Sequence, residues 1–251
     1  MVRRHALLAV GCLALMLGGS CYRPFSTAIR ALPDRMVWAW SRPEDLRWLP
    51  RDVGVAYVAS AVELVGDEAI VRPRAAPLQL RPGVVLVPMV HVDASWRHPP
   101  VLNAAQRRAV VDQLALVAQS ANARVVQLDF EVRKSQQPFL ARVVSDARAR
   151  LPREMGLSMT ALASWCAGDD WLRRIAADEI VPMAFRMAAD DAALRRQLAE
   201  QGGFNRARCM SAAGMATDEP IQLAAPVRRY YFSPTAWTPQ RWSLIQERQA
   251  S

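Results

Sequence analysis

Several residue types on which common chemistries depend are scarce in this sequence. Its 251 residues include three histidines, four cysteines and 11 glycines, and Lys134 is the single lysine. It has no Gly-rich phosphate loop, no His-x-x-x-His or Cys-x-x-Cys pair and no Gly-x-Ser-x-Gly turn. These absences exclude the sequence signatures of phosphate-loop enzymes, zinc peptidases, dithiol oxidoreductases and serine esterases. We expect no metal and no cofactor.

The one long hydrophobic run lies at the N-terminus. Arg3 and Arg4 precede an apolar stretch from Ala6 to Leu17, which is shorter than the roughly 20 residues that span a bilayer. This layout predicts a secretory signal over residues 1–20 and an exported protein. The small residues before Cys21 resemble the lipobox of bacterial lipoproteins, although Leu17 lies one position too far upstream. We expect lipidation at Cys21 and an envelope location; the alternative is ordinary cleavage that leaves Cys21 as a free thiol.

The charge of the chain is positive and almost entirely due to arginine. The net charge is +9, and removing Arg3 and Arg4 with the signal leaves the chain basic. The arginine pairs lie on polar faces of predicted helices, without the interleaved aromatics or the module that a nucleic-acid site requires. We therefore expect no nucleic-acid partner, and an attraction to anionic lipid is the better interpretation.

Cys166 and Cys209 are the cysteines left for pairing in an oxidising compartment. Cys166 follows one predicted strand and Cys209 begins another, which places them near opposite rims of a parallel barrel. A disulfide requires Cα atoms within about 7 Å. We expect two separate buried thiols, with a disulfide as the alternative.

Strand-like segments recur along the chain after a linker over residues 21–35. They cover 36–41, 54–63, 84–93, 124–132, 157–164, 180–187, 209–215 and 228–233. Helical patterns cover 104–121, 137–151, 190–201 and 239–249, with N-caps at Asn103 and Ser135 and a stop at Gly202. Residues 64–83 contain three prolines and no helical pattern. Strands that alternate with helices predict an α/β protein, an irregular (β/α)8 TIM-like barrel forming one domain over residues 36–251.

The alternation of polar and apolar residues along the fourth predicted strand indicates a candidate active site. Gln127, Asp129 and Glu131 share one face, opposite an apolar face that should meet the helices. The polar face then points into the barrel and reaches the C-terminal rim, where barrel enzymes build their active sites. The two carboxylates are separated by about 6.6 Å of strand rise, close enough for repulsion to raise one pKa. The alternative is a structural pair balanced by an arginine or by backbone donors.

Other strands direct polar and aromatic side chains to the same rim. An apolar set at Val181, Met183, Phe185 and Met187 turns Arg186 inward, either as a site residue or as the counter-ion of Asp129. Ser158, Thr160 and Ser164 share one face of their strand. The further binding candidates are His91, Asp93, Trp38, Trp40, Trp165, Asp218 and Glu219. The tryptophans offer flat surfaces for sugar rings, whereas burial in the core is their structural alternative.

Several segments together resemble a bacterial family, the domain-of-unknown-function family numbered 3142. They are VWAW-x-RPEDLR at 37–47, QLDFE with SQQPF at 127–139, LSMTALASWC-x-GDDW at 157–171, VPMAFRM at 181–187, TDEP at 217–220 and YYFSP-x-x-W at 230–237. The resemblance spans residues 36–237 and implies no activity of its own. In that family an aspartate is common where this chain has Glu131.

QLDFE is also similar, more distantly, to the closing Asp-x-Glu of chitinase-like glycoside hydrolase barrels. This resemblance implies that Glu131 protonates a glycosidic oxygen and that Asp129 assists it. Two departures argue against chitinase activity: Gln127 replaces an earlier aspartate, and Phe185-Arg186 replaces a Tyr-Asp pair.

The sequence therefore predicts an exported, lipid-anchored barrel that acts on an envelope or extracellular glycan. The alternative is a non-catalytic envelope protein that binds a glycan or a protein at the rim.

Overall fold

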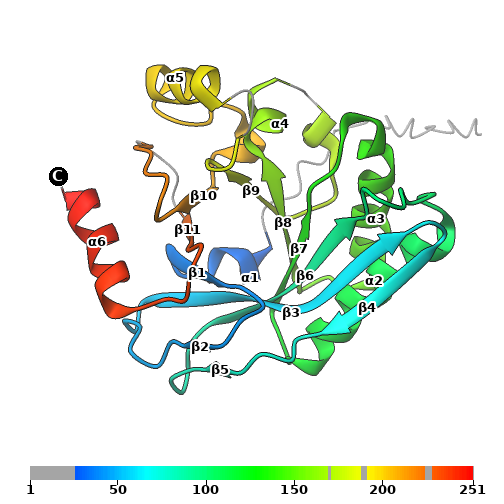
Figure 1. Cartoon of the computed structure of the whole chain (residues 1–251), viewed down its shortest axis with the longest axis horizontal. Helices are drawn as coiled ribbons and strands as arrows, with labels where there is room; N and C mark the ends of the chain where they lie inside the picture. Colours follow the sequence, from blue (N-terminus) through cyan, green and yellow to red (C-terminus); the bar gives the residue numbers. More distant parts are fainter. Residues whose placement is uncertain (1–25, 169–170, 188–190, 224–227, 251) are drawn as a thin grey trace, which may run out of the picture.

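Eight parallel strands close into a barrel in a computed structural model that describes residues 26–168, 171–187, 191–223 and 228–250 (Figure 1). The order around the barrel is β1, β3, β6, β7, β8, β9, β10 and β11, with β11 beside β1. The bounds are β1 Arg35–Ala39, β3 Val53–Val65, β6 Leu86–Ala94, β7 Val125–Phe130, β8 Gly156–Leu162, β9 Glu179–Met183, β10 Ala212–Ala216 and β11 Arg228–Phe232. The predicted TIM-like barrel is confirmed, and each predicted strand segment overlaps one of these strands.

Helices on the outside of the barrel follow the predicted patterns at α2 (Ala104–Ser120), α3 (Gln137–Arg150), α5 (Asp191–Gln201) and α6 (Pro239–Ala250). A further helix, α4 (Ala163–Ala167), was not predicted and begins inside the strand expected over 157–164. Asn103 caps α2 as predicted, since its side chain accepts a hydrogen bond from the Gln106 backbone N–H at 2.8 Å. Ser135 was wrongly predicted as a cap: it lies in a 3-10 turn, η1 (Lys134–Gln136), and α3 begins without a side-chain cap. Gly202 ends α5 with a φ of +69°.

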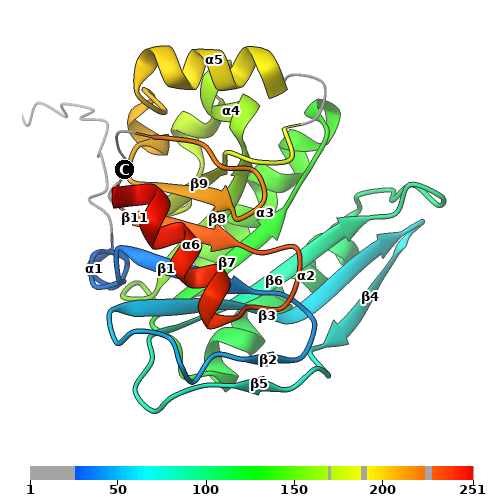
Figure 2. The ribbon, with the colours of Figure 1, turned by 60° about the vertical axis from the view of Figure 1, so that its left-hand side comes forward.

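The connection over residues 64–83 contains no helix, as its prolines predicted. β4 (Glu68–Pro73) pairs antiparallel with β3, and β5 (Leu78–Gln79) pairs with β2 (Glu44–Asp45) in a small second sheet. Figure 2 shows the ends of β3 and β4 projecting beyond the barrel. This hairpin accounts for the irregularity of the barrel.

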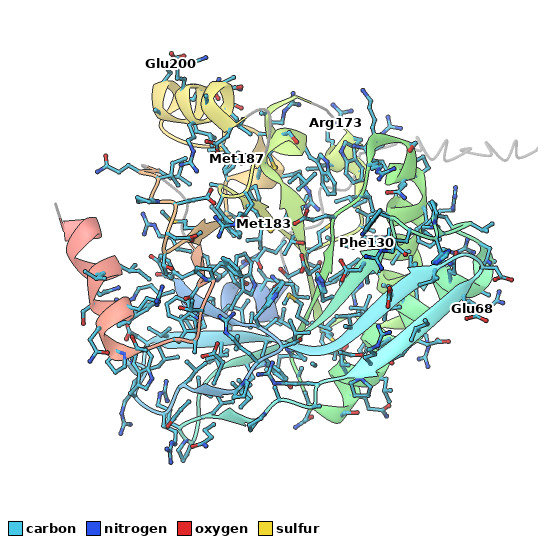
Figure 3. The ribbon with its side chains drawn as sticks, in the orientation of Figure 1. Glu68, Phe130, Arg173, Met183, Met187 and Glu200 are labelled. Carbon is cyan, nitrogen blue, oxygen red and sulfur yellow. A yellow bond between two sulfur atoms is a disulfide. The ribbon has the colours of Figure 1, made fainter. Side chains whose placement is uncertain are left out.

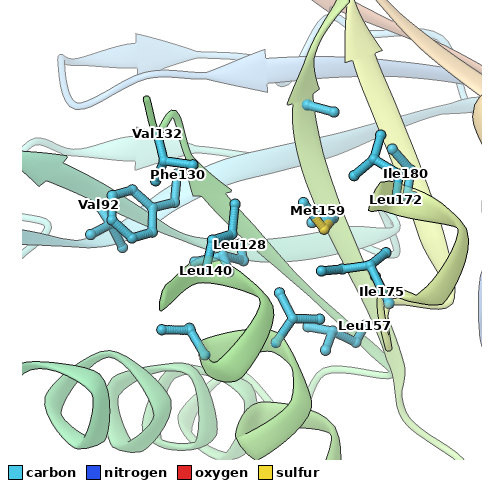
Figure 4. Close-up of a cluster of buried hydrophobic side chains, with 14 of the residues drawn as sticks. Val92, Leu128, Phe130, Val132, Leu140, Leu157, Met159, Leu172, Ile175 and Ile180 are labelled. Carbon is cyan, nitrogen blue, oxygen red and sulfur yellow. The ribbon is translucent and has the colours of Figure 1, made fainter. Parts of the chain in front are cut away.

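The outer face of β7 packs against the helices as predicted. Leu128, Phe130 and Val132 belong to a buried cluster with Leu140 of α3 and Val92 of β6 (Figure 4). The opposite face of β7 carries Gln127 and Asp129, which are both buried.

For residues 180–187, the prediction of which side chains face the inside of the barrel and which face the outside is wrong. Val181, Met183 and Phe185 fill the barrel interior beside Trp38 and Met89, while Ile180 and Ala184 belong to the outer cluster with Phe130. Figure 3 labels Met183 of the interior set and Phe130 of the outer set. Because the interior of a closed barrel is itself packed with side chains, an apolar face of a strand does not identify the outside.

A short helix closes the end of the barrel where the strands begin. In α1 (Thr27–Arg30), Ala28 and Ile29 pack into the interior cluster, and the Arg228 guanidinium donates to the Ile29 carbonyl at 2.9 Å. Residues 26–35, predicted as linker, are therefore part of the folded barrel. The predicted signal and Cys21 lie outside the described residues. Among those described, no helix has the length and apolar character needed to cross a bilayer.

Cys166 and Cys209 form a disulfide, with 6.0 Å between their Cα atoms. The expectation that they lie near opposite rims was wrong. Cys166 lies in α4, which turns back along the outside of β8 and β9, and Cys209 ends a 3-10 turn, η4 (Ala207–Cys209), that also packs on β9. The connections, rather than the strands, bring the two sulfurs together.

Candidate functional site

A cavity of about 170 Å³ opens at the end of the barrel where the strands finish. Most of its wall is aromatic or apolar, and its polar groups come from separate strands. The lining residues are Trp38, Trp40, Met89, His91, Asp129, Glu131, Thr160, Leu162, Met183, Phe185, Arg186 and Phe232. An apolar pocket with a few convergent polar groups is typical of a ligand site.

Asp129 is the buried carboxylate of the cavity, and both of its oxygens accept hydrogen bonds. Thr160 on β8 donates from Oγ1 to Oδ1 at 2.6 Å, and His91 on β6 contacts Oδ2 through Nδ1 at 2.7 Å. These partners come from the strands on either side of β7. The geometry holds the Asp129 carboxylate in one orientation.

His91 links Asp129 to Asp93, because its Nε2 lies 3.1 Å from the Asp93 carboxylate. Burial alone would lower the pKa of His91, but the hydrogen bonds to Asp129 and Asp93 outweigh burial and raise this pKa to about 10. The same contact lowers the pKa of Asp93. His91 is therefore a cation at neutral pH, and the predicted rim position of His91 and Asp93 is where the structure places them.

The stabilisation that His91 provides should disappear in alkali. A folded-state pKa raised from 6.5 to about 10 gives stability that is complete below the unfolded value and is lost as the pH rises toward 10. We expect the free energy of unfolding to fall by about 2 kcal/mol over this range, the size of a hydrogen bond to a charged group. The free energy of unfolding is measured with urea near pH 6.5 and near pH 10, in wild type and in His91→Gln.

The exposed His98 provides the control for this experiment. His98→Gln should keep the wild-type pH dependence, whereas His91→Gln should lose the alkaline decrease. An equal decrease in wild type and His91→Gln would contradict the ion pair.

Glu131 follows β7 directly and lies at the mouth of the cavity, where its side chain still meets solvent. Partial burial, and then the negative charge of Asp129, raise the pKa of Glu131, while His91 opposes the shift. This is the pattern that the spacing of the two carboxylates predicted. A carboxyl with a raised pKa beside a fixed carboxylate is suited to general acid catalysis.

Two predicted tryptophans form the aromatic walls. Trp38 is buried, and its indole N–H donates to the Gln127 side chain at 2.8 Å. Trp40 is half-buried nearer the mouth, with its ring centroid 5.2 Å from that of His91. Gln127 lies below the cavity and supports Trp38, so it does not itself line the site.

Arg186 lines the cavity but does not pair with Asp129. Its guanidinium contacts Asp218 at 2.7 Å and also pairs with Glu219, and its backbone N–H donates to Glu219 at 2.9 Å. β9 ends at Met183, and Arg186 adopts a φ of +53° beyond it. Asp218 and Glu219 thus reach the rim, where they hold Arg186, and the counter-ion role predicted for Arg186 was wrong.

Three candidates lie away from the cavity wall. Trp165 is buried on α4 outside the barrel, where its ring packs against Trp171 at 5.1 Å. Ser164, predicted to share a strand face with Thr160, is exposed on the same helix. Asp93 is exposed beyond the wall and reaches the site only through His91.

Sequence reasoning did not assign Phe185 and Phe232 to the site. Their rings stack at 5.2 Å with an interplanar angle of 3° and line the cavity. Phe232 could have been found, because it lies one residue before the end of the last predicted strand, 228–233. In the described residues, no group of three or more His, Cys, Asp or Glu side chains is arranged to hold a metal ion.

No family model matches the chain, so the resemblance to the family numbered 3142 is not confirmed, and no curated protein matches the sequence. Among solved structures, the chain is similar to a fungal endo-beta-N-acetylglucosaminidase from glycosyl hydrolase family 18. The TM-score is 0.51 and the identity 13%, over 84% of this chain and 95% of that chain. The chain shares the barrel fold of that structure. At this identity the likeness concerns the fold, so the chemistry has to be argued from the site.

Proposed function

We propose that this chain is an exported, lipid-anchored glycoside hydrolase that acts on an envelope or extracellular glycan. The observation that carries the proposal is that Asp129 and Glu131 line one aromatic cavity at the end of β7, with the pKa of Glu131 raised. The similar fold of a family 18 glycosyl hydrolase supports the same reaction class.

Glu131 is the general acid in this mechanism. A raised pKa favours the protonated form of Glu131, which donates its proton to the glycosidic oxygen as the bond to the anomeric carbon breaks. Water then adds to the anomeric carbon and returns a proton to Glu131, which completes the hydrolysis. The Asp129 carboxylate, fixed by Thr160 and His91, lies where it can stabilise the positive charge that develops on the sugar ring. The apolar face of the ring packs on the walls formed by Trp40 and Phe232.

A second candidate function is glycan binding without turnover. Both oxygens of Asp129 are already satisfied by protein donors, and most of the cavity surface is aromatic or apolar, which suits a ligand held by stacking. In this case Glu131 would serve as a hydrogen-bonding group, and Trp40 would supply most of the affinity.

A panel of glycans separates the two functions. The wild-type chain, Glu131→Gln and Trp40→Ala are each incubated with the panel, and both reducing-end release and the shift in melting temperature are recorded. Release by wild type that is absent in Glu131→Gln establishes the hydrolase. A thermal shift without release, kept in Glu131→Gln and lost in Trp40→Ala, establishes the binding protein. Neither release nor shift with any glycan contradicts both.

A further inference from the structure

The two ends of the barrel differ in charge. At the mouth, the two cations that line the cavity, His91 and Arg186, are both paired with carboxylates. At the other end, arginines occupy the segments that lead into the strands. Those that are exposed include Arg30 in α1, Arg51 before β3, Arg124 before β7 and Arg153 before β8.

Acidic side chains at this end do not neutralise the four arginines. Asp52 pairs with Arg35, and Asp178 pairs with Arg148 at 2.8 Å. Within the part of the chain that the structure describes, no ion pair involves Arg30, Arg51, Arg124 or Arg153. The remaining acids here are Asp34 and Glu154, while further arginines are present at 81, 150, 174 and 208.

Contacts between the connecting segments join these arginines into one surface, which we call the basic end. The Arg81 guanidinium donates to the Arg51 carbonyl at 2.8 Å, which ties the segment before β6 to the one before β3. The Gly156 N–H donates to the Arg124 carbonyl at 2.9 Å, and Ser26 at the start of α1 donates to the Glu154 carbonyl at 3.3 Å. Figure 2 shows α1 at this end, opposite the tips of the parallel strands.

We propose that the basic end is a membrane-docking surface that binds anionic phospholipid headgroups and directs the mouth of the cavity away from the bilayer. Guanidinium groups pair well with phosphate. The position of Cys21 also favours a phospholipid surface as the partner of the basic end, because Cys21 precedes Thr27 of α1 by six residues. Such a segment spans at most about 20 Å when extended, so an acyl chain on Cys21 would hold this end close to the bilayer.

Vesicle binding tests the proposal. The chain without the predicted signal, residues 21–251 carrying Cys21→Ser, cannot be acylated at that position and is mixed with vesicles of phosphatidylcholine alone or of phosphatidylcholine with phosphatidylglycerol. We expect tighter binding to the anionic vesicles, weakened by added salt. Adding Arg51→Glu, Arg124→Glu and Arg153→Glu should reduce that binding by at least on the order of 100-fold, since each arginine near an anionic surface contributes several-fold.

A second triple variant keeps the total charge the same. Arg108→Glu, Arg142→Glu and Arg196→Glu change exposed residues of α2, α3 and α5, away from the basic end, and should retain most of the binding. Melting temperatures confirm that both variants are folded. Equal losses in the two variants, or equal binding to neutral and anionic vesicles, would overturn the proposal. Binding to duplex DNA through the basic end without binding to the anionic vesicles would also overturn it.

Discussion

Turnover by Glu131→Gln should be about 100- to 10,000-fold below wild type, the usual contribution of a positioned general acid. Glutamine has the same shape but no proton to give to the leaving oxygen. Glu131 lies at the mouth with its side chain partly in solvent, so the substitution removes chemistry without removing a buried contact. The melting temperature should therefore stay within experimental error, and kcat/KM on the substrate found in the glycan panel measures the effect.

Glu200→Gln on the outer side of α5 is the matched control (Figure 3). It makes the same chemical change on an exposed helix and should leave turnover unaltered. The pH profile gives an independent test, because the negative charge of Asp129 helps to raise the pKa of Glu131. In Asp129→Asn the fall in activity at high pH should move to lower pH. If Glu131→Gln keeps wild-type turnover, Glu131 is not the acid.

The sequence was most informative where polarity alternates with the strand period. In β7, one buried apolar face and one buried polar face could be read directly, which placed Asp129 and Glu131 correctly. The same reasoning failed at residues 181–185, because both buried faces of this segment are apolar. Inside and outside then differ only in which apolar surface each side chain meets, and that is a property of the closed barrel rather than of the strand.

The sequence also could not show which residues far apart in the chain contact one another. Nothing in the spacing of residues 91 and 129 shows that His91 and Asp129 touch, since their contact depends on the register between β6 and β7. The pairing of Arg186 with Asp218 and Glu219 likewise depends on a turn in which Arg186 has a positive φ. Both groups were predicted at the rim, but their partners required the assembled barrel.

Apart from Gln127 and Ser158, the polar groups of the lower barrel interior were missed, although they are buried. The Glu179 carboxylate accepts hydrogen bonds from Ser158 at 2.8 Å and from the Tyr230 hydroxyl at 2.9 Å, and it pairs with Arg228. Burial and the nearby charge of Glu179 raise the pKa of Tyr230 well above its ordinary value. These groups lie below the cavity, so their role is in folding. The Arg228 guanidinium also donates to a backbone carbonyl of α1, which connects this helix to the buried groups.

Glu179→Ala should lower the free energy of unfolding by about 3–5 kcal/mol, because removing one partner of a buried ion pair leaves the other charge without compensation. The Arg228 guanidinium would keep its carbonyl partners in α1 but lose its counter-ion in a site closed to water. Urea unfolding at neutral pH measures the change. Glu63→Ala removes a surface ion pair with Arg72 on the β3–β4 hairpin, and should cost no more than about 1 kcal/mol.

A double variant separates the loss of charge balance from the loss of packing. In Glu179→Leu with Arg228→Met, neither charge remains, and apolar side chains of similar size fill the space. Because a buried pair is often replaced at little cost by well-packed apolar residues, this double variant should be more stable than Glu179→Ala. A Glu179→Ala protein as stable as Glu63→Ala would instead mean that water reaches Arg228 and that α1 does not seal this end of the barrel.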